Sequence, residues 1–154
     1  MHEVHGDVGE NRDRLVLYIE RQGIELVFTE NIAPALGVSY GGRIAILPGQ
    51  SKAETFATLV HELAHELLMH STRRTTTTKT VRETEAEAVA FVVGKAIGLQ
   101  TGNASASYIS LYHGNASLLI ESLEVIQQTS AVILAALEPS ATETMPDAEL
   151  AKVA

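Results

Sequence analysis

The alternation of hydrophobic and polar residues predicts a helix and then a strand near the start of the chain. Leu15, Tyr18 and Ile19 fall on one side of a short helix that Gly23 ends. Residues 24–30 then alternate between apolar and polar side chains with a period of two, which is typical of a strand with one buried face. The first elements are therefore expected to be one helix and one strand.

A β-hairpin is predicted at residues 37–47. Two runs rich in β-branched and aromatic residues flank Gly41 and Gly42, and glycine tolerates the positive φ angles of a tight two-residue turn. Pro48 and Gly49 end the second strand. This hairpin and the preceding strand predict a small antiparallel or mixed sheet.

The rest of the chain has the pattern of helices. Ser51 and Glu54 have the spacing of a capping box and begin a helix that is expected to run to His70. A second helix is expected at residues 80–97, ended by Gly98, and further helices at residues 104–112 and 115–137. The last helix has apolar residues at spacings of three and four, which favours a face that packs on the core over a coiled-coil partner: Leu119, Leu123, Ile126, Ile133 and Leu137.

These elements predict one α+β domain. The 154 residues are enough for a single domain with its own core. We expect a flexible polar arm at residues 1–10, the domain at residues 11–137 and a disordered tail at residues 138–154.

Charge and composition exclude several classes of function. The formal charge is −8, with 11 basic and 19 acidic residues, which disfavours direct binding to nucleic acid. The chain has no cysteine, so disulfides, thiolate zinc clusters and cysteine nucleophiles are excluded. We found no signal peptide and no apolar run close to the ~20 residues of a membrane span. A cytoplasmic protein without a membrane partner is expected, and the sequence leaves the oligomeric state open.

The central helix carries the sequence His-Glu-Leu-Ala-His at residues 61–65. Residues four apart lie on one face of a helix, so His61 and His65 can each offer a nitrogen to one ion. Glu62 lies about 100° further round, where it can act as a base toward a water molecule at the metal. The alternative to a metal site is that both histidines are packed in the core with hydrogen-bond partners. Because burying three polar groups on an apolar helix costs several kcal/mol without compensation, we favour a metal site.

A third ligand is expected from the next helix. Glu83, Glu85 and Glu87 all lie near its start, where the helix dipole would also favour solvated acids. Glu83 and Glu87 share a face with small residues, Ala90 and Gly94, that would let two helices approach closely. We therefore prefer Glu83 as the ligand, with Glu87 orienting a ligating histidine and Glu85 or Glu87 as the alternative ligands.

The His-Glu-Leu-Ala-His motif and residues 83–90, Glu-Thr-Glu-Ala-Glu-Ala-Val-Ala, resemble the ImmA/IrrE family of gluzincin-type metallopeptidases. They are similar also to the zincin domains of antirestriction proteins. The resemblance covers about residues 23–98 and places Glu83 on the ligand position and Glu87 on the orienting position. It implies a zincin-like fold: a small sheet with a hairpin packed on the central His-Glu-x-x-His helix, followed by a helical C-terminal half. It also implies zinc-dependent cleavage of a regulatory protein.

Other candidate residues have weaker support. Residues 37–41, Gly-Val-Ser-Tyr-Gly, match the nucleophile elbow of serine hydrolases, but a strand follows them where that motif requires a helix. Tyr108, Tyr112 and His113 could stabilise an oxyanion, although each is more readily explained as a packing residue or a helix end.

The sequence thus predicts a zinc endopeptidase with one Zn²⁺ per chain, held by His61, His65 and Glu83, and with Glu62 as general base toward a peptide or protein substrate. The alternative is a non-catalytic zinc-bearing regulatory or interaction domain in a mobile-element or stress-response system, whose fourth ligand would be His70 or His113. A metal-free helical interaction domain is the third possibility.

Overall fold

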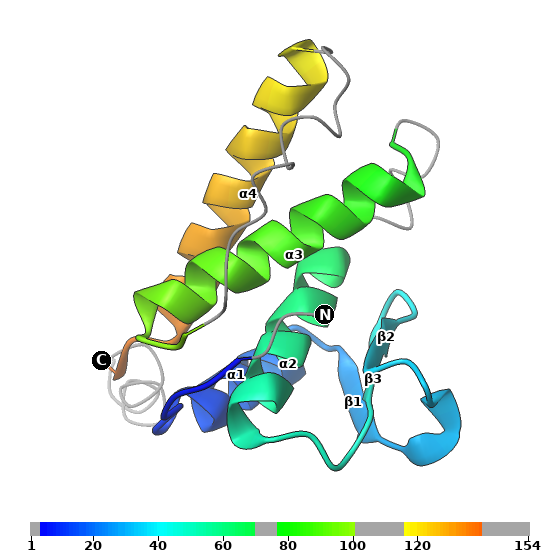
Figure 1. The fold of residues 1–154 in the computed structure, drawn as a ribbon, viewed down its shortest axis with the longest axis vertical. Helices are drawn as coiled ribbons and strands as arrows, with labels where there is room; N and C mark the ends of the chain where they lie inside the picture. The colour runs from blue at the N-terminus through cyan, green and yellow to red at the C-terminus, as the bar shows by residue number, and fades with distance from the viewer. Residues whose placement is uncertain (1–3, 70–76, 101–115, 140–154) are drawn as a thin grey trace, which may run out of the picture.

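The structure is a computed structural model that describes residues 4–69, 77–100 and 116–139. Figure 1 shows the sheet on one side of the helices α1 and α2, and α3 and α4 on the other. The predicted α+β class is confirmed. The elements follow one another as α1 (Asn11–Arg21), β1 (Glu25–Phe28), the 3-10 helix η1 (Glu30–Ile32), β2 (Gly37–Ser39), β3 (Arg43–Ile46), α2 (Lys52–Leu67), α3 (Lys79–Ala96) and α4 (Ala116–Ala136).

The sheet is mixed, with the strand order β1-β3-β2. β2 and β3 form the predicted hairpin, in which Val38 lies opposite Ala45, and β1 runs parallel to β3. Gly41 and Gly42 form the two-residue turn, with φ angles of 77° and 101° that suit glycine. The hairpin therefore places β2 at an edge of the sheet.

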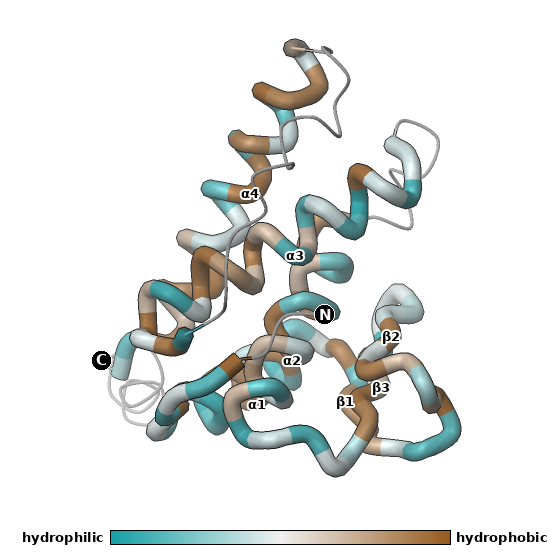
Figure 2. The backbone as a smooth tube through the Cα atoms, in the orientation of Figure 1, coloured by the Kyte–Doolittle hydropathy of each residue, from teal (hydrophilic) through white to brown (hydrophobic). Residues whose placement is uncertain are grey.

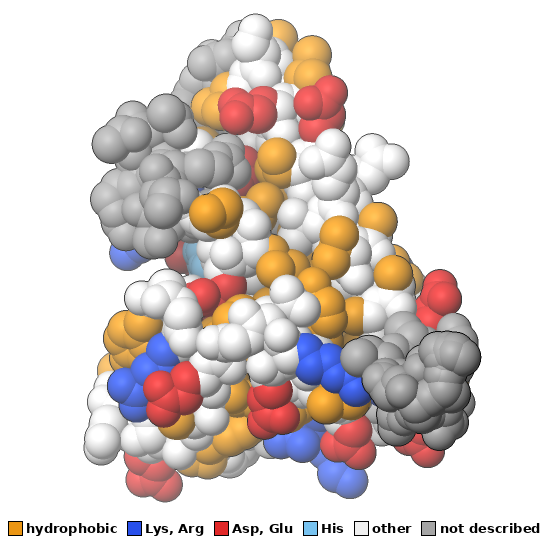
Figure 3. Space-filling model, turned by 180° about the vertical axis from the view of Figure 1, so that it is seen from behind, with side chains coloured by type: hydrophobic (Ala, Val, Ile, Leu, Met, Phe, Trp, Pro, Cys, Tyr) orange, Lys and Arg blue, Asp and Glu red, His pale blue; other side chains and the backbone are white. Residues whose placement is uncertain are grey.

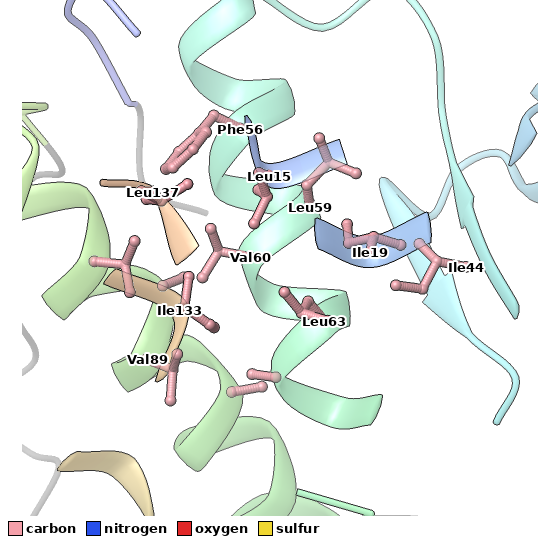
Figure 4. Packing of buried hydrophobic residues seen from close by; sticks show 14 of the residues in the cluster. Leu15, Ile19, Ile44, Phe56, Leu59, Val60, Leu63, Val89, Ile133 and Leu137 are labelled. Atoms are coloured by element: carbon pink, nitrogen blue, oxygen red, sulfur yellow. The ribbon is translucent and has the colours of Figure 1, made fainter. Parts of the chain in front are cut away.

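The central helix α2 begins as predicted. The Ser51 hydroxyl accepts a hydrogen bond from the Glu54 amide, and the Glu54 carboxylate accepts one from the Ser51 amide. α2 packs against α1 and the sheet on one side and chiefly against α3 on the other. Figure 4 shows side chains of these neighbours around it, and the labelled residues are Leu15, Ile19, Ile44, Phe56, Leu59, Val60, Leu63, Val89, Ile133 and Leu137. This packing fixes one face of α2 against α3.

The helices α3 and α4 agree with the sequence in extent but only partly in their buried faces. Both lie within one residue of their predicted ends, and Gly98 follows α3 with a φ of 95°. α4 is hydrophobic along most of its length (Figure 2). Ile126 and Ile133 are buried as expected, whereas Leu123 is 48% exposed. That expectation was wrong because the buried face of α4 turns toward α3 through Ser122 instead.

Part of the predicted flexible arm is packed. Val4 and Val8 are buried in the hydrophobic core. His5 and Gln100 exchange two backbone hydrogen bonds, with N···O distances of 2.9 and 2.8 Å. The burial of these two valines and the backbone pairing with Gln100 hold the segment against the core, and residues 4–10 therefore belong with the domain.

The predicted helix at 104–112, and the predicted tail from residue 140 onward, lie outside the described residues. Contrary to the expectation from the sequence, α4 is long and apolar enough to span a membrane by length and composition, a test that core helices of soluble proteins also pass. Its buried residues pack on α3 in the structure. A cytoplasmic location stays a prediction.

Candidate metal centre

Two histidines of α2 lie side by side, next to α3. His61 and His65 are one helical turn apart, and their ring centroids are 5.0 Å apart with an angle of 70° between the ring planes. Both rings are largely buried, with 19% and 12% of the side chain exposed. The helix therefore presents two imidazoles to the same small volume, as the spacing of four predicts.

Glu83 of α3 closes this group. Its two carboxylate oxygens lie 3.1 Å from the Nε2 atoms of His61 and His65, one oxygen to each ring. The three candidate ligand atoms all lie within 4.8 Å of one another. A tetrahedral ion with ligands at about 2.0–2.1 Å has its ligand atoms roughly 3.3 Å apart, so small side-chain shifts would suffice. His61, His65 and Glu83 could therefore hold a metal ion.

Glu87 lies one turn further along α3 and contacts the other nitrogen of His61. Its Oε1 atom is 3.0 Å from Nδ1 of that ring. This contact orients the ring, and in the neutral ring that a metal requires it favours the tautomer with the hydrogen on Nδ1 and the free electron pair on Nε2. Glu87 therefore lies where it could orient the His61 ring, and its role beside a metal stays a prediction.

Glu85 does not belong to the group, and the prediction of it as an alternative ligand was wrong. It is fully buried on another side of α3, where the Ser122 hydroxyl of α4 donates to its carboxylate at 2.5 Å. Two residues along a helix correspond to about 200° of rotation. The helix periodicity therefore separates Glu85 from Glu83 and Glu87.

Electrostatic pairing holds the group together. Burial by itself lowers the pKa of His61, but the hydrogen bonds to Glu83 and Glu87 outweigh it and raise that pKa from 6.5 to about 10. The same hydrogen bonds, first from His61 and then from His65, hold the pKa of Glu83 far below its ordinary value. At neutral pH, without a metal, a proton on His61 thus takes part in binding the Glu83 carboxylate.

Glu62 is buried beside these residues. Only 7% of its surface is exposed. Burial raises its pKa, while the nearby charges of His61 and His65 act in the opposite direction. Gly37 of the edge strand β2 lies next to Glu62. A Cβ atom added at Gly37 would lie only 2.9 Å from the Glu62 Cγ atom. Glu62 is therefore an acidic group with a raised pKa, held next to the candidate ligands and the edge strand β2.

Part of a histidine side chain is exposed on the face that Figure 3 shows, and an acidic side chain lies beside it. Tyr108, Tyr112, His113 and His70, named from the sequence as further candidates, lie outside the described residues.

Sequence reasoning missed one residue at this site. Glu66, directly after His65, accepts hydrogen bonds from the hairpin turn. Its position one turn after Glu62 was visible in the sequence. No sequence signal indicates that the hairpin lies next to that face of α2.

Comparisons of the chain with protein-family profiles, with curated proteins and with solved structures found no match. The geometry of the described residues therefore carries the functional argument.

Proposed function

We propose that this protein is a zinc-dependent metallopeptidase that hydrolyses peptide bonds of a protein substrate. The observation that carries the proposal is the approach of Glu83 to the Nε2 atoms of both His61 and His65, at 3.1 Å each. Two imidazoles and one carboxylate are the protein ligands of many catalytic zinc sites, which keep a further position for water or substrate. We propose also that the fold is zincin-like and that the chain is related to the ImmA/IrrE family.

The chain supplies a base next to this site. A bound zinc ion would lower the pKa of water to about 7 and polarise the substrate carbonyl. Glu62 would accept the proton of the attacking water and return it to the leaving amine. Burial raises the pKa of Glu62 and so brings it closer to the neutral range in which a proton carrier works well.

The edge strand β2 gives a place for the substrate backbone. The amide of Tyr40 donates to the Arg43 carbonyl at 2.8 Å, and the amide of Leu47 donates to the Leu36 carbonyl at 2.9 Å. In an antiparallel ladder this alternation turns the backbone groups of the residues between, Gly37 and Ser39, away from β3. An extended peptide could pair with them, and it would then run past Glu62.

The alternative is a structural zinc site that joins two helices (a zinc staple) without catalysis, and it gives no role to Glu62. A staple requires ligands but no carboxylate buried beside them, and burial of an acid costs free energy unless it is compensated. The position of Glu62 at the edge strand thus favours catalysis.

Two variants test the proposal. Zinc should co-purify with the parent at one ion per chain, by elemental analysis, and should be lost in His65→Ala. Glu62→Gln should keep the zinc and lower kcat on a proteome-derived peptide library by about 10²–10⁴-fold, followed by mass spectrometry of the cleavage products. Cleavage by Glu62→Gln at the parent rate would refute the mechanism, and zinc in the parent without any cleavage would favour the staple.

A further inference from the structure

The hairpin turn is tied to the C-terminal end of α2 by Glu66. One oxygen of its carboxylate accepts from the Gly41 amide at 2.9 Å and from the Ser39 hydroxyl in a short hydrogen bond. The other oxygen accepts from the Gly42 amide at 2.7 Å. A single side chain thus binds three donors of the turn, and the residue directly before it in α2 is the candidate ligand His65.

The opposite end of β2 is tied to the start of α2. The Gln50 amide nitrogen donates to the carbonyls of Leu36 and Leu47, at 3.2 and 2.8 Å. The amide oxygen of Gln50 accepts from the Thr58 hydroxyl at 2.8 Å. Both ends of the short edge strand are therefore connected to α2 by side-chain hydrogen bonds.

Between these two connections, the backbone of β2 lies directly on the helix. An added Cβ at Gly37 would lie 2.7 Å from Thr58 Cγ2 and 2.9 Å from Glu62 Cγ, so a side chain there would force a shift. Thr58, Glu62 and Glu66 are spaced by four and form one stripe of α2 beneath the strand. The general base proposed above is the middle member of this stripe.

The helix by itself does not favour an acid at position 66. Glu66 lies in the last turn of α2, where the negative end of the helix dipole disfavours a carboxylate. The two turn amides compensate, because successive backbone N–H groups in a glycine turn form a concavity that binds anions. The carboxylate of Glu66 is thus stabilised by the hairpin turn and destabilised by the dipole of its own helix.

We propose that Glu66 is a positioning residue, which holds the edge strand at a fixed height above Glu62 and so sets the register of the bound peptide. This inference rests on the proposed peptidase function and deepens it. Gln50 holds the other end of β2 against α2 in the same way. Loss of the Glu66 connection would free the turn end of β2, while His61, His65 and Glu83 would keep their mutual contacts.

The test compares Glu66→Gln and Glu66→Ala with Glu20→Gln, which makes the same chemical change on the exposed surface of α1. Amide hydrogen exchange, read for Gly41 and Gly42, reports on the connection itself without reference to activity. Zinc affinity, KM, kcat and the positions of cleavage are then measured with a peptide that the parent cleaves. We expect faster exchange at both glycines, zinc affinity within about threefold of the parent, a roughly tenfold higher KM and less uniform cleavage positions in both Glu66 variants.

A purely structural role would give a different result. It would lower the folded fraction and kcat in proportion, with KM and the cleavage positions unchanged, and that outcome would overturn the proposal. Unchanged exchange at Gly41 and Gly42 would overturn it as well. If Glu66→Ala does not fold, Glu66→Gln decides between these outcomes. A parent that cleaves no peptide refutes the peptidase function itself, whereas an active parent with equally active Glu66 variants refutes only the positioning role.

Discussion

Two glutamates of the same helical turn have opposite surroundings. Glu83 faces α2, is half-exposed and is bound by two histidines. Glu85 is fully buried and accepts a hydrogen bond from a serine of α4. The first lies with residues that could hold an ion, and the second joins two helices. The difference shows that two carboxylates only two residues apart on one helix meet different neighbours, because one faces α2 and the other faces α4.

Replacement of Glu83 should have the largest effect, and the quantity that it changes should be the affinity for zinc. We expect Glu83→Ala to weaken zinc binding by about 10³-fold, because one of three ligands and its charge are lost. The stability of the metal-free fold should change much less, since Glu83 is half-exposed. Competition with a chromogenic chelator measures the affinity. A parent-like affinity would remove Glu83 from the ligand set.

Replacement of Glu85 should show the reverse pattern. Glu85→Ala leaves a cavity and a buried Ser122 hydroxyl without this acceptor, and we expect a loss of about 2–4 kcal/mol in the free energy of unfolding. Glu85→Gln keeps the shape and an acceptor and serves as the matched control. Urea unfolding of the metal-free protein gives both values, and the zinc affinity of the folded variants should stay near that of the parent. A large loss of zinc affinity in Glu85→Gln would contradict the division between the two glutamates.

The smallest expected effect is the change of zinc affinity with pH. The pKa of His61 is raised from 6.5 to about 10, so the metal-free protein keeps this proton above neutrality. Its contribution to stability is complete below pH 6.5 and is lost progressively as the pH rises from 6.5 to about 10. Zinc must displace the proton, and its affinity should therefore rise about tenfold per pH unit between pH 7 and 8.5. Titrations at several pH values measure this slope.

Glu87→Gln is the control for the pH prediction. It removes one of the three carboxylates that raise the His61 pKa, so the affinity should depend less on pH in this variant. A slope that is identical in parent and variant would show that Glu87 does not govern the proton on His61.

The local elements were predictable because their signals are local. The capping box at Ser51, the glycine pair of the hairpin and the glycine after α3 each fix a backbone conformation within a few residues. The spacing of His61 and His65 likewise follows from the helix period. Errors arose where side chains meet distant parts of the chain, as at the exposed Leu123 and in the packed segment of residues 4–10.

By itself, the sequence determined which segments form helices and strands, and that two histidines and a neighbouring acid share one turn of the central helix. The tertiary structure decided which glutamate of α3 meets them, and it joined Glu66 to a hairpin more than twenty residues earlier in the chain. The physical reason is that helix and turn geometry depend on neighbouring residues, whereas the packing of α3 and the hairpin against α2 depends on the shape of the whole core.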